Sequence, residues 1–356
     1  MNDAFSKRLN ELLNELFAGL NQDYTLAKIA GDASNRVYSR IFLRNGAAPV
    51  SSLVVMRFPP EAAFASEEAT ALSCGPKRHA FLDMASYLAR HDLPVPVVYC
   101  ADLAHGLILL EDLGDALLYD EVIAAPAAAR EASYRDAIDL WQRWLSATAD
   151  ESDRDTLAFS RRFDSTLLNW ELEHYVEWGL EALYGIALSP AEREVVTRAF
   201  TRLTDELCAL PQVLVHRDFQ SRNLMRRGSE LCLIDFQDAL LGPLSYDLVA
   251  LLRDSYVVLS PLSRDRLIDY AFDTLSQAGL CPLSADEFRS AFFLQTLQRK
   301  LKDSGRFVFI ERKKRNPWFL QHIPASLGYV REAFAKCPDY EDLQDVLARI
   351  ETRLLL

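Results

Sequence analysis

The stretch that decides the fold reads LVHRDFQSRNLM over residues 214–225, followed by LIDFQD over residues 233–238. The apolar run 213–215 leads directly into a loop that carries Asp218, and the apolar run 231–234 leads directly into Asp235. A short buried strand that ends in a carboxylate holds that group rigidly at its exposed end. We therefore predict two such strands, each presenting an acidic side chain to a common site.

The two segments match the catalytic loop of kinases, H-R-D-x-x-x-x-N, with a D-F-x motif that begins 12 residues after Asn223. Phosphoryl transfer needs a carboxylate that orients the acceptor hydroxyl and takes its proton, and Asp218 suits this role. Magnesium prefers oxygen ligands, which the Asn223 amide and the Asp235 carboxylate can supply. Any acidic loop after a strand resembles part of this pattern, but the matched asparagine and the second aspartate make the combination specific for phosphoryl transfer.

Upstream of this stretch, short runs of alternating or apolar residues predict strands, and turn signals separate several of them. A helical pattern over 80–90 interrupts them, and residues 1–20 have the spacing of an amphipathic helix. The predicted strands are Tyr24–Ile29, Arg36–Leu43, Leu53–Phe58, Pro96–Tyr99 and Leu107–Leu110.

After Gly114 the pattern becomes helical, with long periodic segments over 133–148 and 166–183. We therefore predict an α+β, two-lobed, protein-kinase-like fold. Residues 1–113 form a small β-rich N-lobe that covers the nucleotide, and residues 114–356 form a larger helical C-lobe with the catalytic loop, the metal site and the acceptor cleft.

The composition limits the partners of this 356-residue chain. Its formal net charge of −12 disfavours a nucleic-acid or anionic-membrane partner. No apolar run approaches the ~18 residues that a membrane-spanning helix needs. The six cysteines are never closer than 24 residues, which disfavours a clustered zinc site, and the N-terminus lacks the pattern of a secretory signal. We expect a cytoplasmic protein with reduced thiols.

Two longer strings, LIDFQDALLGPLSYDLVALLRD over 233–254 and LQRKLKDSGRFVFIERKKRNPWFLQHIP over 297–324, carry a family resemblance. With the catalytic loop they resemble the aminoglycoside phosphotransferase and choline-kinase-like family. Most similar are bacterial kinases that phosphorylate C1 of N-acetylmuramate and N-acetylglucosamine in cell-wall recycling. The resemblance runs from Gly31 to about Val330 and implies an enzyme that uses ATP and Mg²⁺ to phosphorylate a small hydroxylated sugar.

By this resemblance Asp218 is the catalytic base, and Asn223 and Asp235 hold Mg²⁺. His216 and Asp247 support the catalytic loop. An alternative role for Asp247 is capping of the helix that follows it.

Nucleotide contacts are expected from two segments of the N-lobe. Gly31, Ser34 and Asn35 lie between two strands, where a loop covers the phosphates, although a plain hairpin turn explains one glycine equally well. Glu111 and Leu113 lie in a segment that resembles the hinge whose backbone binds adenine.

The strand 53–58 offers Arg57 where a kinase has its phosphate-binding lysine. Arginine can bind a phosphate with two parallel hydrogen bonds, but it does not replace lysine equivalently. This substitution puts the usual lysine–glutamate pair in doubt, and Glu67 and Glu68 are the candidate partners.

Several alternatives stay open at this point. The acceptor can be an aminoglycoside, choline or homoserine instead of an amino sugar, and the chain can be a catalytically silent nucleotide-binding scaffold. The sequence assigns no acceptor-binding residue: the basic run 312–315 suits either a solvated loop or contact with an anionic sugar. It also leaves open the choice between ATP and GTP and the oligomeric state.

Overall fold

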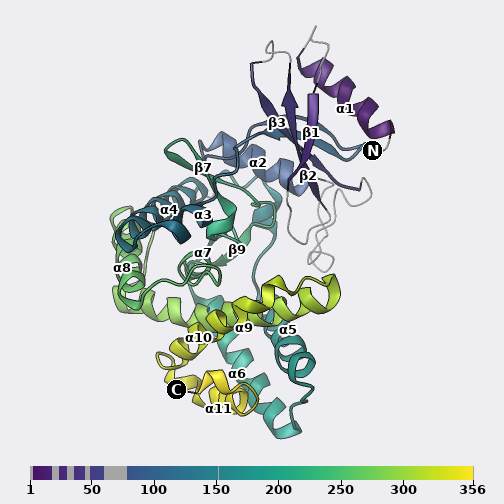
Figure 1. Cartoon of the computed structure of the whole chain (residues 1–356). Helices are drawn as coiled ribbons and strands as arrows, with labels where there is room; N and C mark the ends of the chain where they lie inside the picture. The colour runs from purple at the N-terminus through teal and green to yellow at the C-terminus, as the bar shows by residue number, and fades with distance from the viewer. Residues whose placement is uncertain are drawn as a thin grey trace. The chain divides into compact units, whose positions relative to one another are not determined.

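A computed structural model describes residues 3–17, 24–29, 36–44, 49–59, 78–150 and 152–355 (Figure 1). The chain divides into two compact units, which we call unit 1 and unit 2. Unit 1 comprises residues 1–116 and 225–237, and unit 2 comprises residues 117–224 and 238–356.

Unit 1 contains a five-stranded antiparallel sheet with the strand order β1-β2-β3-β5-β4. The five predicted strands are all present; β2 begins one residue and β4 two residues later than predicted. Their bounds are β1 Tyr24–Lys28, β2 Val37–Leu43, β3 Ser52–Arg57, β4 Val98–Asp102 and β5 Leu107–Glu111.

The amphipathic N-terminal helix α1 (Asp3–Leu16) covers one face of this sheet (Figure 1). Leu9 and Leu13 of the helix are fully buried in one core with Leu53 and Val55 of β3. Burying one leucine side chain is worth roughly 1.5–3 kcal/mol, so this face holds the helix on the sheet. The alternation along β3 therefore fixes which of its side chains face α1.

The segment with the second predicted strand also belongs to unit 1. Strands β7 (Leu224–Arg227) and β8 (Glu230–Leu233) form a hairpin, and the Leu233 N–H donates to the Pro94 carbonyl at 2.8 Å. Helix α2 (Ala80–Arg90), predicted with these bounds, stacks its Phe81 ring on Phe236 at 5.2 Å. These contacts fix the position of Asp235 within unit 1.

Unit 2 is mostly helical, as predicted, with one antiparallel pair of short strands, β6 (Gln212–Val215) and β9 (Leu240–Pro243). No helix in the described part of the chain is long and apolar enough to span a membrane. The helices are α3 Leu118–Ala124, α4 Ala127–Thr148, α5 Ser165–His174, the π-helix η4 Tyr175–Ala182, α6 Pro190–Ala209, α7 Ser245–Leu252, α8 Pro261–Gln277, α9 Ala285–Lys314, α10 Ile323–Phe334 and α11 Glu341–Ile350, with short 3₁₀ turns that include η5 Ser221–Asn223 and η6 Pro317–His322.

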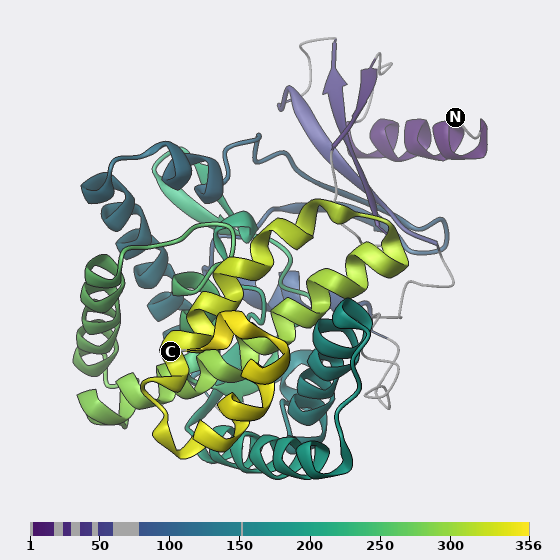
Figure 2. The same cartoon turned by 60° about the horizontal axis from the view of Figure 1, so that its bottom comes forward.

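The 30-residue helix α9 packs against α5, α7, α10 and η4 (Figure 2). A capping box of Ser284 and Glu287 starts it. At Gly305 a Cβ atom would lie 2.7 Å from the Tyr175 Cα atom, so only glycine permits this close approach to η4. Arg299, near the middle of α9, contacts the loop that follows β6.

Candidate active site

The catalytic loop, residues 216–223, begins where β6 ends, and the buried Asp247 of α7 holds its backbone. Asp247 accepts hydrogen bonds from the His216 N–H at 2.7 Å and the Arg217 N–H at 3.0 Å. No side-chain cap is formed at the start of α7, whose N-cap residue is Leu244. Arg217 has a φ of 79°, a strained value for a residue with a side chain, and the two hydrogen bonds stabilise it.

Burial raises the pKa of Asp247 to about 7, against the lowering effects of the His216 N–H and the nearby Arg299. The carboxyl group is fully buried. Its proton affinity therefore depends on the two backbone donors and on a cation from α9.

A second buried carboxylate, Asp254, holds the other end of the loop. It accepts the Ser221 N–H at 3.1 Å and the Ser221 hydroxyl, and it also accepts the Tyr256 N–H at 2.9 Å. Both ends of the catalytic loop are thus fixed by aspartates of the segment 247–254.

The Asp218 side chain contacts Arg299, which reaches it from α9. Arg299 Nη2 donates to Asp218 Oδ1 at 3.2 Å, and Arg299 Nη1 donates to the Arg217 carbonyl at 2.7 Å. The Arg299 side chain is 3% exposed, whereas that of Asp218 is 40% exposed. Burial alone would raise the pKa of Asp218, but Arg299, followed by Lys302 and Arg217, holds it below its usual value.

Behind Arg299 lies a buried polar network centred on Glu171, whose side chain is 1% exposed. Gln298 Nε2 donates to Glu171 Oε2 at 2.8 Å. Arg217 Nη2 and Lys302 Nζ lie 3.5 Å and 3.9 Å from Glu171 Oε1. Removing one partner of such a buried network leaves an uncompensated charge. These side chains therefore hold one another in position.

Asn223 is oriented by the same loop. Its Nδ2 donates to the Asp218 carbonyl at 2.8 Å. A carbonyl oxygen accepts only, so the bonded atom is the amide nitrogen, and the amide oxygen is the atom left for other ligands. This orientation fits a residue that offers one hard oxygen to a cation.

Asp235, which belongs to unit 1, has a φ of 63°, again a value that non-glycine residues rarely adopt. Gln237 Nε2 donates to Asp235 Oδ1 at 2.8 Å, and Phe236 between them is fully buried. In the described residues no three or more His, Cys, Asp or Glu side chains gather as a metal site. Magnesium in nucleotide-dependent enzymes typically takes one or two protein carboxylates together with waters and phosphates, so an asparagine and an aspartate fit it.

At the end of β5, the Glu111 side chain is engaged within unit 1. It accepts the Val97 N–H at 3.1 Å and lies 3.2 Å from Arg227 Nη1. In the described part of the chain no hydrogen bond engages the Leu113 N–H. The other expected nucleotide residues, Gly31, Ser34 and Asn35, lie outside the described residues, as do Glu67 and Glu68.

The segment 112–115 is held by Arg40 of β2. Arg40 Nη2 donates to the Gly114 carbonyl at 2.8 Å, and ion pairs of 2.8 Å join Arg40 to Asp112 and Asp115. Burial alone would raise the pKa of Asp112, but Ser52, the Gly114 N–H and Arg40 together lower it.

Arg57 lies on the α1 side of the sheet. It follows Leu53 and Val55 along the same face of β3, and its guanidinium carbon is 4.6 Å from the centre of the Phe5 ring of α1. Met56, on the opposite face, is fully buried. The sequence predicted contact of Arg57 with a phosphate, and the position of its guanidinium against Phe5 of α1 disfavours this contact.

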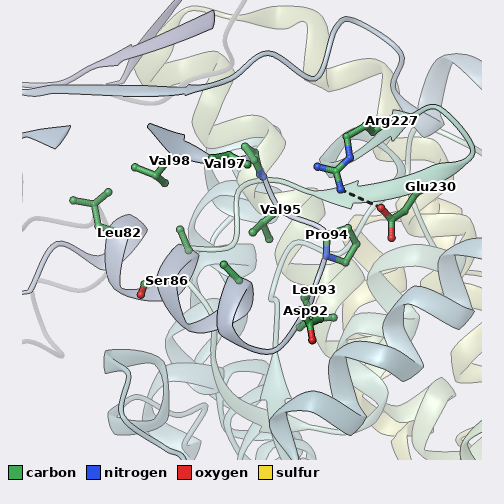
Figure 3. Close-up of a pocket in the computed structure, with 13 residues that line it drawn as sticks. Leu82, Ser86, Asp92, Leu93, Pro94, Val95, Val97, Val98, Arg227 and Glu230 are labelled. Carbon is green, nitrogen blue, oxygen red and sulfur yellow. Dashed lines mark hydrogen bonds and ion pairs between the residues drawn. The ribbon is translucent and has the colours of Figure 1, made fainter. Parts of the chain in front are cut away.

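A pocket of about 620 Å³ opens in unit 1 between α2 and the segment 92–98 (Figure 3). Leu82, Val97 and Val98 contribute apolar walls, and the Arg227–Glu230 ion pair of 3.0 Å lies at its edge. None of the predicted site residues that the structure describes lines it. Two of its lining residues, Val97 and Arg227, contact Glu111, which the sequence predicts to bind the nucleotide.

Sequence reasoning missed Arg299, Glu171, Asp254 and Arg40. A signal existed for the first: the string QRKLKD over 298–303 puts consecutive polar residues into a helix whose neighbours are apolar, and charged residues are rarely buried unless they are paired. The string contributed only to the family resemblance, with no role given to its side chains.

The family model described as "Phosphotransferase enzyme family" matches residues 25–281. The N-acetylmuramate/N-acetylglucosamine kinase of Pseudomonas putida is 30% identical over 96% of this chain and 94% of its own length. The kinase of the same name from Neisseria meningitidis is 30% identical over 92% and 91%. These matches confirm the resemblance found in the sequence strings.

Solved structures share the fold at low sequence identity. The ADP-bound aminoglycoside phosphotransferase APH(2'')-Ib has a TM-score of 0.59 at 14% identity and covers 94% of this chain and 99% of its own. Choline kinase from Cryptosporidium parvum has a TM-score of 0.59 at 12% identity, with 96% and 98% covered. They confirm the predicted protein-kinase-like α+β fold.

Proposed function

Because the chain belongs to the phosphotransferase enzyme family, we propose that it is a kinase that transfers a phosphoryl group from ATP to the anomeric hydroxyl of N-acetylmuramate or N-acetylglucosamine. The observation that carries the proposal is the Asp218 carboxylate, which is partly exposed while the groups that fix it are buried. The names and full-length coverage of the 30%-identical relatives support the choice of sugars.

In this proposal Asp218 accepts a hydrogen bond from the acceptor hydroxyl and receives its proton as the new O–P bond forms. The bond between the γ-phosphorus and the bridging oxygen breaks, and ADP leaves. An anomeric hydroxyl is more acidic than an ordinary alcohol, so a carboxylate with a lowered pKa is a sufficient base. Arg299 acts as a positioning residue, since it engages one oxygen of the base through a buried guanidinium.

Asn223 and Asp235 would supply oxygen ligands to Mg²⁺, which neutralises charge on the transferred phosphoryl group. The orientation of the Asn223 amide and the strained backbone of Asp235 support these assignments. For Asp235 the assignment rests also on the spacing of the sequence motif.

For the nucleotide we propose that the backbone from Glu111 to Leu113 receives the purine and that Gly31, Ser34 and Asn35 face the phosphates. The unengaged Leu113 N–H supports the first part. We further propose that the enzyme acts in the cytoplasm, where ATP is supplied.

The test is ATP consumption screened against N-acetylmuramate, N-acetylglucosamine, glucose, kanamycin, choline and homoserine. We expect turnover with the two N-acetylated sugars and a product whose C1 proton is coupled to phosphorus in NMR spectra. The methyl glycoside should compete weakly and remain unphosphorylated.

Other outcomes decide between the alternatives. Phosphorylation of the methyl glycoside at the rate of the free sugar would exclude C1 as the acceptor. Turnover with kanamycin, choline or homoserine and with neither sugar would identify that compound as the acceptor instead of a sugar. Nucleotide binding without turnover on any acceptor would favour a silent scaffold.

A further inference from the structure

Arg222 lies in the catalytic loop between Ser221 and Asn223, and its guanidinium group is surrounded by aromatic rings of unit 2. The guanidinium carbon is 5.0 Å from the ring centres of both Tyr256 and Trp318, and 6.0 Å from that of Tyr119. A cation this close to ring faces is held by cation–π attraction.

The rings form a cluster that we call the aromatic platform, made of Tyr119, Tyr256, Trp318 and His322. Tyr256 and Trp318 stack at 5.7 Å with 27° between their planes, and His322 lies 4.7 Å and 4.6 Å from them. Trp318 is 40% exposed, and the other three rings are half-buried. A residue of the core would be covered on all sides, so these partly exposed rings form part of the surface of unit 2.

Hydrogen bonds connect the aromatic platform to Asp254, which also holds the catalytic loop. Asp254 accepts the Tyr256 N–H as well as the Ser221 N–H. His322 Nδ1 lies 3.2 Å from the Ser255 carbonyl oxygen. The Tyr256 backbone and the His322 ring are therefore held in place without a ligand, which lowers the entropic cost of binding.

We propose that the aromatic platform and Arg222 form the acceptor subsite, where ring faces pack on the apolar face of the sugar and Arg222 binds the carboxylate of an acidic sugar. The proposal rests on the proposed function. Ring contact uses the flat face of the guanidinium, and its N–H donors lie in the plane, so the same group can bind a carboxylate edge-on through two parallel hydrogen bonds.

The exposed basic run 312–315 is a weaker candidate for the carboxylate. Arg312 is 52% exposed and pairs with Glu311 at 3.1 Å, while the Lys313 Nζ atom lies 5.3 Å from the centre of the Trp178 ring. Exposed charges of this kind contribute little in solution. Arg222 is less exposed and is one residue from Asn223 in the catalytic loop.

The two proposed acceptors provide an internal comparison, because N-acetylmuramate carries a lactyl carboxylate that N-acetylglucosamine lacks. Arg222→Gln should lower the ratio of kcat/KM for N-acetylmuramate to that for N-acetylglucosamine by roughly 10- to 100-fold, the size of a lost charge-assisted hydrogen bond. Arg222→Lys should lower this ratio less than Arg222→Gln does, because lysine keeps the charge but cannot donate two parallel hydrogen bonds.

Trp318→Ala should raise KM for both sugars to a similar extent, since both share the apolar ring face, and Trp318→Phe should restore most of the affinity. Arg312→Gln is the matched control, and it should leave both specificity constants within twofold of the wild type. Because both values of kcat/KM are measured on the same enzyme preparation, their ratio does not depend on the fraction of enzyme that is folded.

The failures are distinguishable. A wild-type enzyme that phosphorylates neither sugar contradicts the proposed function. A wild type active on both sugars whose ratio is unchanged in Arg222→Gln and Arg222→Lys overturns the subsite and leaves the kinase assignment standing. A ratio that falls in Arg312→Gln instead would assign the carboxylate to the basic run.

Discussion

The catalytic loop of unit 2 and the segment 112–115 of unit 1 are held by the same device in different surroundings. Arg299 donates to the Arg217 carbonyl and to the Asp218 carboxylate, and Arg40 donates to the Gly114 carbonyl and pairs with two carboxylates. The Arg299 side chain is 3% exposed and that of Arg40 is 14% exposed. Among their carboxylate partners, Asp112 is 7% exposed, Asp218 is 40% exposed and Asp115 is 79% exposed.

Two arginines with the same kinds of contact can therefore have different roles. Arg299 lowers the pKa of Asp218 and Arg40 helps to lower the pKa of Asp112, whereas water and salt screen the pair of Arg40 with the exposed Asp115. The two arginines differ in what they hold: Arg299 contacts the predicted base, and Arg40 holds a backbone segment. We therefore expect substitutions around Arg299 to change chemistry and those around Arg40 to change nucleotide affinity modestly.

The largest effect is expected for Asp218→Asn. If Asp218 is the base that Arg299 orients, kcat should fall by ~10²–10⁴ while ATP affinity stays close to that of the wild type. Steady-state kinetics and calorimetry with ATP measure the two quantities. Turnover within threefold of the wild type would mean that the arginine holds a carboxylate without a catalytic role.

Arg299→Gln is expected to rank second and to shift the pH profile. Arg299 lowers the pKa of Asp218, so its removal should raise that pKa and move the acidic limb of kcat/KM to higher pH. Arg299→Lys should place the limb between those of the wild type and the glutamine variant, because the charge is retained. A merely structural role would lower activity equally at all pH values.

The sequence predicted the parts of the site that lie within one short motif. Asp218, Asn223 and His216 are fixed by a loop of eight residues, and its local pattern is visible in the string. Arg299 comes from a helix 81 residues away, a tertiary contact that no local pattern reports.

Two further features show the same limit. Strands β7 and β9 were not predicted, since four residues with few β-branched side chains give little signal. The face on which Arg57 lies was also undecided, because β3 is apolar on both faces and only the packing of α1 on Leu53 and Val55 distinguishes them.

Asp247→Asn is expected to have an intermediate effect. An asparagine offers one acceptor to the two N–H groups of His216 and Arg217, so the free energy of unfolding should fall by about 1–3 kcal/mol. The folded-state pKa of about 7 lies above the ordinary 3.8, so this group's contribution to stability is lost as pH rises through 7. Denaturation at pH 5 and pH 8 should show a larger advantage of the wild type at pH 5, and a deficit independent of pH would contradict the raised pKa.

The smallest effects are expected for two arginines of the sheet in unit 1, which form a matched pair. Arg40→Gln should raise the KM for ATP by roughly 3- to 10-fold at low salt, by loosening the segment that we propose receives the purine, and less at 0.5 M salt. Arg57→Ala should leave that KM within twofold of the wild type and cost about 0.5–1 kcal/mol of stability, because its guanidinium stacks on Phe5. The opposite pattern, a raised KM in Arg57→Ala alone, would favour the phosphate contact expected from the sequence, since the stacking on Phe5 would then give way when nucleotide binds.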